Sequence, residues 1–237
     1  ASLIPSISSG DIISGERMQL IVGAGYRLPG FEGYGIPMRQ RPGRMTEGIE
    51  IIRRCWEEEE FSFEGRYWNP KNVRVMPKPV QKPHPPIWVG AHSPASLEFA
   101  AKKNYNVSQN LDVDPVIAEK FEHWRQAWRQ CQHPGPMPRT FLMRAVHVAE
   151  TDKLAREEAE KALLASRGLL REGIEKTRVG FKGTEPTPTN QELNRVFQGM
   201  NTSFEFWIEN GLALVGSPET VIRKTREVLS QLRPGIL

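Results

Sequence analysis

The 237-residue sequence predicts an α/β fold built on parallel strands. Short apolar runs have the length and composition of buried strands, the segments between them show helical spacing, and the two kinds of segment alternate along the chain. Four strands are predicted, at residues 18–22, 87–90, 107–111 and 140–149. Four strands fit a small open sheet or part of a (β/α)8 barrel. The abrupt ends favour the barrel, since residues 233–237 stop where a new strand would begin.

The predicted helices follow from the spacing of apolar residues. The longest are expected at about 44–59, after Pro94, around 117–128, after a Thr151-Asp152 cap, and after Pro218. Shorter helical stretches are expected near 191–199 and 203–209. The positions expected to face inward are Met45, Ile49, Ile52 and Trp56; Leu97, Ala100 and Ala101; Ile117, Phe121, Trp124 and Trp128; Ala155, Ala159, Ala162 and Leu163; Val221, Ile222, Thr225, Val228 and Leu229.

The remaining segments are rich in Gly and Pro and are predicted as loops. One runs from the first strand through Pro42, and another covers 174–190. Residues 61–86 combine Pro, aromatic residues and Lys, so they are predicted as an insertion in a single domain that covers 1–237. This insertion either packs against the domain or forms a dimer surface.

Composition and charge exclude several classes of protein. Hydrophobic residues make up 38% and charged residues 25%, which predicts a folded core. The net charge is +4, but basic residues are interleaved with acids and the densest charge run, 57–60, is acidic. No nucleic-acid partner is therefore expected. No apolar run reaches about 18 residues, so no membrane span is expected either. No signal peptide is visible in a sequence that starts at Ala1, and a cytoplasmic location is expected.

Cysteine and histidine spacing gives no sign of a metal site. Cys55 and Cys131 form no CxxC motif, and both fall on apolar helix faces, where we expect them to be buried. The five histidines form neither HxH nor HExxH, so no metal is predicted. His147 lies on a predicted strand and is expected to be a core or lumen residue. His92 belongs to a candidate ligand-binding turn.

That turn is Gly90, Ala91, His92 and Ser93, between a strand and a helix. Ser93 followed by proline is a good helix cap, and a cap alone would explain the pattern. Gly90 also allows a ligand to approach the carboxyl end of the strand, and free N–H groups at a helix start favour a phosphate. Spacing alone supports the helix cap and the phosphate site equally. For the similar turn at 216–218, a helix cap is sufficient.

A second glycine turn, at Gly23, Ala24, Gly25, Tyr26 and Arg27, follows the first strand. It is GxG rather than GxGxxG, and no acidic residue follows at the dinucleotide spacing, so a Rossmann site is weakly supported. It is either a tight turn or a point where the backbone approaches a flat ring or a phosphate. In the second case Arg27 is the expected anion partner.

Four stretches together resemble the bacterial luciferase-like family of flavin-dependent oxidoreductases. They are "DIISGERMQLIVGAGYR" (11–27), "YGIPMRQRPGRMTEGIEIIRRCW" (34–56), "FSFEGRYW…PKPVQKPHPPIWVGAHSPASLEFAAKK" (61–103) and "LVGSPETVIRKTREVL" (214–229). Three departures stand out. Glu16 replaces a glycine of the family's Ser-Gly-Gly-Arg pattern, Ala91 stands where many members have a second glycine, and 104–107 (Asn-Tyr-Asn-Val) replaces Gly-Asp-Gly-Trp. The third departure affects expected contacts near the substrate.

The resemblance implies a (β/α)8 barrel with an insertion. The chain would be incomplete, covering about strand four to the helix before strand eight. Family members bind FMN, or F420 in one branch, at the carboxyl ends of the strands. The implied contacts are Gly23, Ala24, Gly25 and Tyr26 near the flavin, and Gly90, Ala91, His92 and Ser93 near its phosphate arm. Catalytic residues are unknown, because several members take them from the early strands.

The expected activity is a flavin-dependent monooxygenase that uses reduced FMN and O2 to oxidise a small organic substrate. One alternative is an F420-dependent reductase or dehydrogenase on the same scaffold. The other is a non-catalytic flavoprotein or a defective fragment. The expected partners are the small organic substrate, O2, a flavin reductase and further copies of the chain. A homo-oligomer is expected because four βα units leave two sheet edges exposed.

Overall fold

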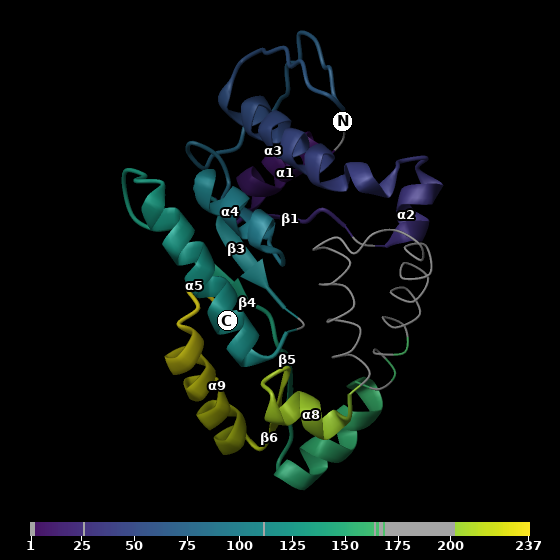
Figure 1. Ribbon diagram of the computed structural model, residues 1–237, viewed down its shortest axis with the longest axis vertical. Coiled ribbons are helices and arrows are strands. Elements are labelled where there is room, and N and C mark those ends of the chain that lie inside the picture. Colours follow the sequence, from purple (N-terminus) through teal and green to yellow (C-terminus); the bar gives the residue numbers. More distant parts are fainter. Residues whose placement is uncertain (1–2, 26, 111, 164, 166–167, 169–201) are drawn as a thin grey trace. The chain divides into compact units, whose positions relative to one another are not determined.

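A computed structural model describes residues 3–25, 27–110, 112–163, 165, 168 and 202–237 (Figure 1). The chain divides into two compact units. The first consists of Ala1–Gly25 and Phe31–Gly90, and the second of Tyr26–Gly30 and Ala91–Leu237. The single domain stays a prediction. The loop expected at 174–190 and the helix expected at 191–199 lie outside the described residues.

The first unit contains two parallel strands, β1 (Leu20–Val22) and β2 (Ile87–Gly90). Each lies near the C-terminal end of one of the two segments that form the unit. Their register pairs Leu20 with Ile87 and Val22 with Val89, so both strands end at the same edge. The helices α1 (Leu3–Ser14) and α3 (Arg41–Glu57) belong to the same unit. The predicted bounds of β1, β2 and α3 are confirmed within a few residues, and β2 matches its prediction at both ends, whereas α1 was not predicted.

The Gly/Pro-rich loop predicted between β1 and α3 contains two short helices. These are α2 (Leu28–Gly33) and the 3-10 helix η1 (Met38–Gln40). Proline is tolerated in a first helical turn, where its missing N–H is not needed, so Pro29 does not prevent α2. Gly35, with φ +62°, follows soon after its end. The loop prediction is therefore wrong for these nine residues.

The insertion at 61–86 packs against α1 and α3 of its own unit and forms no helix. One isolated antiparallel bridge joins Phe61 to Val73. The buried Asp11 carboxylate accepts hydrogen bonds from the Val80 amide (2.8 Å), the Gln81 amide (2.9 Å) and the Gln81 side chain (2.6 Å). Burial alone would raise the pKa of Asp11, but these hydrogen bonds outweigh it and lower the pKa.

Glu47 of α3 is the second anchor of the insertion. Its carboxylate accepts hydrogen bonds from the amides of Arg66 (2.9 Å), Tyr67 (2.9 Å) and Trp68 (3.2 Å). A Cβ added to Gly65 would lie 2.4 Å from the same carboxylate, so this turn needs a glycine. Of the two interpretations of the insertion, the described contacts favour packing against its own unit.

The second unit contains two further parallel strand pairs. Strand β3 (Asn106–Gln109) pairs with β4 (Thr140–Leu142), and β5 (Ala145–Val148) pairs with β6 (Ala213–Gly216). Helix α5 (Asp114–Gln130) packs against α4 (Pro94–Lys102) and against α9 (Pro218–Leu232) (Figure 1). Helix α8 (Phe204–Glu209) packs on β6. Strands alternating with helices confirm the predicted α/β class.

The predicted strand 140–149 is divided between two partners. Its first part, β4, pairs with β3, and its second part, β5, pairs with β6. Arg144 lies at the division, and its Nη2 donates to Asp114 Oδ1 at 2.6 Å. The prediction of one continuous strand is wrong because apolar alternation identifies extended residues but not their partners.

An isolated bridge lies near the C-terminal end of the described chain, and no strand is formed there among the described residues. Ile236 forms an isolated parallel bridge with Phe141, in which the Leu142 amide donates to the Ile236 carbonyl at 3.0 Å. The Ile236 amide donates to Thr140 at 2.9 Å. That the strands belong to a (β/α)8 barrel, from about strand four to the helix before strand eight, stays a prediction.

The core of the second unit lies between the helix at 152–163, α8 and β6. Its buried members are Ala155, Ala159, Phe204, Trp207, Ile208, Leu212, Ala213 and Val215. Three residues predicted to face inward are instead exposed: Ala162, Ile222 and Leu229. Cys55 is buried as expected, but Cys131 is exposed because α5 ends at the residue before it.

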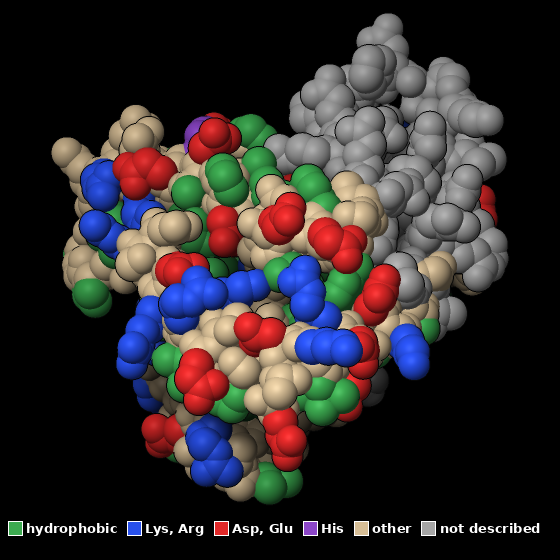
Figure 2. Space-filling view, turned by 90° about the horizontal axis from the view of Figure 1, so that it is seen from below, with side chains coloured by type: hydrophobic (Ala, Val, Ile, Leu, Met, Phe, Trp, Pro, Cys, Tyr) green, Lys and Arg blue, Asp and Glu red, His purple; other side chains and the backbone are tan. Residues whose placement is uncertain are grey.

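The structure can be compared with the membrane and charge arguments that were made from composition. No described helix combines the length and apolar character needed to cross a membrane. On the face seen in Figure 2, acidic side chains lie among the Lys and Arg side chains.

Candidate functional site

The first glycine turn begins where β1 ends. Because Val22 is opposite Val89, Gly23 and Gly90 occupy the same sheet edge on neighbouring strands. Gly23 is exposed, and a Cβ added to it would meet no heavy atom within 4 Å. Its own neighbours therefore do not require a glycine, and the open space beside it allows a ligand to approach the backbone.

Gly25 is a glycine for conformational reasons. Its φ is +75°, and an added Cβ would lie 3.2 Å from the Phe31 ring. Its carbonyl accepts a hydrogen bond from Arg41 Nη1 at 2.8 Å, which holds this turn against the start of α3. Ala24 between the two glycines is half-buried.

Arg41 is only 8% exposed, although it carries a positive charge. The carbonyl of Gly25 is its one hydrogen-bond acceptor among the described residues, and no described carboxylate pairs with it. Burial lowers the pKa of Arg41. It is also the first residue of α3, whose first turn holds no acidic side chain and whose N-cap, Gln40, makes no side-chain cap.

The last two residues of the predicted turn are less informative. Tyr26 lies outside the described residues. Arg27 is exposed, and its proposed role as anion partner stays a prediction. Sequence reasoning missed Arg41, whose guanidinium donates a hydrogen bond to the Gly25 carbonyl of this turn. A cation at a helix N-terminus, where the helix dipole disfavours it, was the available signal.

The second turn leads from β2 into α4. Ala91 is fully buried, and it is not among the described non-glycine residues with positive φ, so alanine is tolerated there. Ser93 is the N-cap as predicted: its Oγ accepts from the Ser96 amide at 3.4 Å, and its amide donates to Ser96 Oγ at 3.0 Å. This capping box uses two of the amides near the helix start. The Ala95 amide has no acceptor among the described residues.

Gln109, at the end of β3, reaches the same turn. It is 1% exposed, and its Nε2 donates to the Ala91 carbonyl. Its Oε1 is buried and has no hydrogen-bond partner in the described part of the chain. A buried acceptor without a donor is costly, so this oxygen is a candidate for binding a ligand donor. β3 reads Asn-Val-Ser-Gln, so Gln109 does not stand out from its strand in the sequence, and only the structure singles it out.

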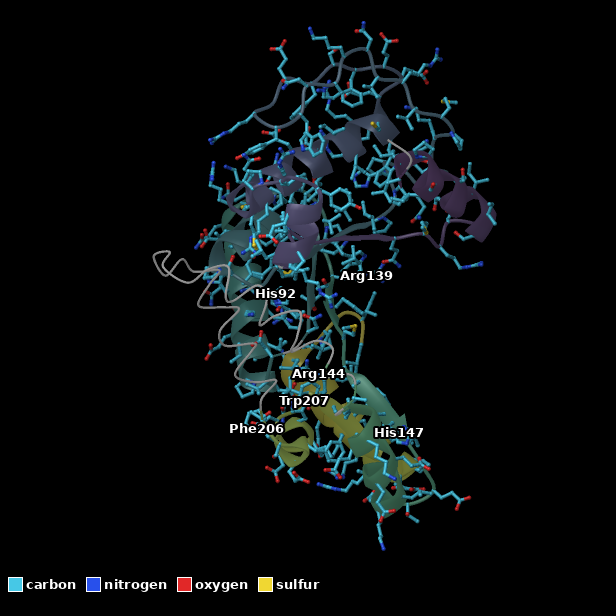
Figure 3. All side chains as sticks on the ribbon, turned by 90° about the vertical axis from the view of Figure 1, so that its right-hand side faces the viewer. His92, Arg139, Arg144, His147, Phe206 and Trp207 are labelled. Atoms are coloured by element: carbon cyan, nitrogen blue, oxygen red, sulfur yellow. The ribbon has the colours of Figure 1, made fainter. Side chains whose placement is uncertain are left out.

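The histidines singled out in the sequence do not come together. His92 is half-buried at the start of α4, and His147 lies well apart from it in β5 (Figure 3). His147 is bonded to Glu158 Oε2 at 2.7 Å and is partly exposed, so the expected core or lumen role is wrong. Its two neighbours in β5, Val146 and Val148, are more exposed still. Within the described ranges, no three His, Cys, Asp or Glu side chains gather as a metal site would require.

The turn at 216–218 is a helix cap, as predicted. Ser217 Oγ accepts from the Thr220 amide at 3.3 Å. The Asp152 carboxylate accepts from the Ser217 amide at 2.6 Å and from Thr220 Oγ1 at 3.0 Å. These hydrogen bonds lower the pKa of Asp152. The protein's own carboxylate thus occupies the anion position at this helix start, in contrast to the turn before α4.

Residues 104–107, which differ from the family's Gly-Asp-Gly-Trp, form the junction between α4 and β3. Asn104 has φ +57°, a conformation that asparagine tolerates better than most residues, and its Oδ1 accepts from Trp128 Nε1 at 2.7 Å. Tyr105 is buried with its ring edge-on to Phe99. Asn106 Oδ1 accepts from the Arg139 amide at 2.8 Å. These contacts are structural.

The fold is that of an α/β protein with two glycine turns that follow parallel strands. The family model described as luciferase-like monooxygenase matches residues 8–233, so the chain belongs to this family of oxidoreductases. The resemblance inferred from the four sequence stretches is confirmed.

Individual relatives agree with this assignment. The chain is 28% identical over 160 residues to the oxygenase component of flavin-dependent trigonelline monooxygenase from Acinetobacter baylyi, an alignment that spans 64% of this chain and 42% of that one. A Baeyer-Villiger monooxygenase from Pseudomonas putida, solved with FMN, has a TM-score of 0.71 at 22% identity and covers 99% of this chain and 67% of its own. An F420-dependent tetrahydromethanopterin reductase from Methanopyrus kandleri has a TM-score of 0.68 at 16% identity, with 99% and 70% covered. At these levels of identity, the two solved structures show only that this chain shares their fold.

Each unit by itself offers groups that suit a flavin phosphate or ribityl chain. In the first unit the space beside Gly23 is open. In the second unit, among the described residues, the Ala95 amide has no acceptor and the buried Gln109 Oε1 has no hydrogen-bond partner. A flavin mononucleotide presents phosphate oxygens to accept from amides, and it presents hydroxyl and ring N–H groups to donate to an amide oxygen.

Proposed function

We propose that the chain is part of an FMN-dependent monooxygenase that uses reduced FMN and O2 to oxidise a small organic substrate. The observation that carries the proposal is the pair of glycine turns that leave one edge of the β1–β2 pair, in a chain of the luciferase-like family. The activities named for the trigonelline and Baeyer-Villiger relatives support it. A cytoplasmic location, a flavin reductase partner and a homo-oligomer belong to the same proposal.

The proposed roles of the residues are binding and orientation. Gly23 and Gly90 admit the cofactor close to the backbone, and the turn at 90–93 with the Ala95 amide holds its phosphate. Gln109 Oε1 accepts a hydrogen bond from a ribityl hydroxyl or a ring N–H. Bound reduced FMN supplies the electrons for oxygen activation, and the chain supplies position and exclusion of water. We assign no catalytic residue.

The alternative cofactor is F420, with a reductase or dehydrogenase activity. The likeness to the F420-dependent reductase shows that one fold carries both cofactors among these proteins. A non-catalytic flavoprotein or a defective fragment is the other alternative.

Titration of the purified chain with oxidised FMN, and with F420 in parallel, tests the proposal through the change in cofactor fluorescence. Saturable binding with preference for FMN supports the monooxygenase. Preference for F420 would replace it by the reductase. Binding of neither cofactor would refute cofactor binding by this chain and favour the non-catalytic alternative.

A further inference from the structure

Arg144 is a buried cation just after β4 whose hydrogen bonds are incomplete. Its side chain is 1% exposed, and its Nη2 donates to Asp114 Oδ1 at 2.6 Å. Its Nη1 makes a long contact of 3.5 Å with the Met143 carbonyl. The buried Nε–H has no acceptor in the part of the chain that the structure describes. A buried donor without an acceptor is costly, so an acceptor oxygen supplied by a ligand would stabilise this site.

Asp114, the partner of Arg144, is fixed by the chain around it. The Asp114 amide donates to the Asn210 carbonyl at 3.3 Å. A Cβ added to Gly211, which has φ +76°, would lie 2.1 Å from Asp114 Oδ2, so the backbone after α8 passes close to the carboxylate. Because the carboxylate is held in this way, it fixes the guanidinium and therefore the direction of the unpartnered Nε–H.

The position of Arg144 is the edge of the sheet at which α/β proteins bind ligands. In the second unit, β3 and β4 are parallel with Gln109 opposite Leu142, and Arg144 follows two residues after Leu142. The Met143 amide donates to the Gln109 carbonyl at 3.0 Å, so the two chains stay adjacent up to this point. Ligand sites of such folds lie at the carboxyl ends of the parallel strands.

The charge of this site decides which ligands suit it. Among the described residues, Asp114 is the carboxylate that pairs with Arg144, so the buried pair carries no net charge. A carboxylate ligand would add an uncompensated negative charge, whereas a neutral carbonyl oxygen accepts a hydrogen bond without that cost. The neighbourhood is apolar: Val113 packs against the core that contains Trp207, and Figure 3 shows Arg144 in the same part of this unit as Phe206 and Trp207.

We propose that Arg144 recognises a neutral substrate with a carbonyl group, through a hydrogen bond from its Nε–H to the carbonyl oxygen. Asp114 is the positioning residue, which neutralises and orients the guanidinium. The inference rests on the proposed monooxygenase function and names the substrate class of that function. It separates ketones, esters and amides from carboxylates of the same size, because the two groups differ in charge at the atom that Arg144 contacts.

The test uses cyclohexanone labelled with 13C at its carbonyl as the neutral probe, and cyclohexanecarboxylate as an anion of similar size. Both are titrated into the chain with and without oxidised FMN. A hydrogen bond from Nε–H moves the carbonyl 13C resonance downfield, and the titrations give the Kd of each probe. The wild-type chain should bind cyclohexanone at least about 10-fold more tightly than cyclohexanecarboxylate.

Two variants separate the donor from the ion pair. In Arg144→Lys a methylene replaces Nε, while the ammonium group can still pair with Asp114. The 13C shift of cyclohexanone should be lost and its Kd should rise about 10- to 100-fold. Asp114→Asn leaves the arginine charge uncompensated, so the preference should move towards cyclohexanecarboxylate by about 10-fold or more. Arg139→Lys, an exposed site just before β4, is the matched control and should keep the wild-type affinities.

The outcomes distinguish this inference from the proposed function. Equal cyclohexanone affinity and 13C shift in the wild type and Arg144→Lys would overturn the inference, as would a wild type that binds no cyclohexanone. An unchanged preference in Asp114→Asn would overturn the charge argument and the inference with it. If Asp114→Asn does not fold, as judged by its melting temperature, Arg144→Lys decides alone. Failure to bind FMN would refute the proposed function, and the titrations without FMN would still decide whether Arg144 binds a carbonyl.

Discussion

At the scale of single residues, three of the four family glycine positions that carry another residue show different consequences of the replacement. Ala91 avoids positive φ and is accommodated, and Asn104 adopts φ +57° and gains a hydrogen bond from Trp128. Glu16 adopts φ +65°, directly after Gly15 at +62°. A left-handed conformation costs a residue with an ordinary side chain about 1–2 kcal/mol. Of these three positions, Glu16 is the one where strain is expected.

We predict that Glu16→Gly stabilises the chain by up to about 1 kcal/mol, because relief of the strain exceeds the extra flexibility of glycine in the unfolded state. The amide of residue 16 donates to the Asp11 carbonyl in either case. Urea unfolding monitored by tryptophan fluorescence measures the difference. Gly15→Ala is the matched control, since an added Cβ there meets no atom within 4 Å and should destabilise through conformation alone. A less stable Glu16→Gly variant would contradict the argument.

At the scale of elements, two strands side by side can have opposite environments. Val146 of β5 is 57% exposed, and its register partner Leu214 of β6 is 3% exposed. Both belong to apolar runs, so the sequence does not distinguish them. The helix starts differ in a similar way: α4 is capped by Ser93 and Ser96, three residues apart, whereas α9 is capped by Ser217 together with Asp152, 65 residues away.

We predict that Asp152→Asn destabilises the chain at neutral pH and that the difference disappears in acid. The folded-state pKa of Asp152 is lowered from 3.8, chiefly by the Ser217 amide and then by Thr220. Its contribution is therefore fully present above about pH 4 and is lost as the pH falls through the lowered pKa. Asparagine cannot accept from both donors in the same way, because one of its two atoms is an NH2 group.

Melting temperatures between pH 3 and pH 8 measure this effect. The wild-type and Asp152→Asn curves should converge at the acid end. Asp114 carries a carboxylate at the start of α5 in the same unit, but it pairs with Arg144, so Asp114→Asn gives a comparison at another helix start. A constant difference at all pH values would show that the charge of Asp152 is not responsible.

At the scale of the whole molecule, the residues of the two predicted glycine turns fall in different compact units. Gly23 to Gly25 belong to the first unit, and Ala91 to Ser93 belong to the second. A ligand that binds the folded chain and not the unfolded chain stabilises it by mass action.

We therefore predict that FMN at about 100 times its Kd stabilises the folded chain by about 2.7 kcal/mol, which raises the melting temperature by several degrees. Differential scanning calorimetry at increasing FMN concentration measures the shift. Lumichrome, which shares the ring but has no ribityl phosphate, is the control and should stabilise less. No shift at saturating FMN would count against cofactor binding.

The sequence by itself determined what depends on neighbours along the chain. It predicted the α/β class, the bounds of β2, the serine caps of α4 and α9, and the buried face of α4, since strand period, cap and helical period are local properties. The family followed from motifs of the same kind.

Only the tertiary structure decided which distant groups meet. It divided 140–149 between two strand partners, turned Val146 to solvent, and joined Asp152 to Ser217. It also showed that Arg41 is buried with no carboxylate partner among the described residues, and that Gln109 donates to the Ala91 carbonyl. A residue's type and spacing state what it can bond, but burial and the distance to a partner far along the chain decide what it does bond.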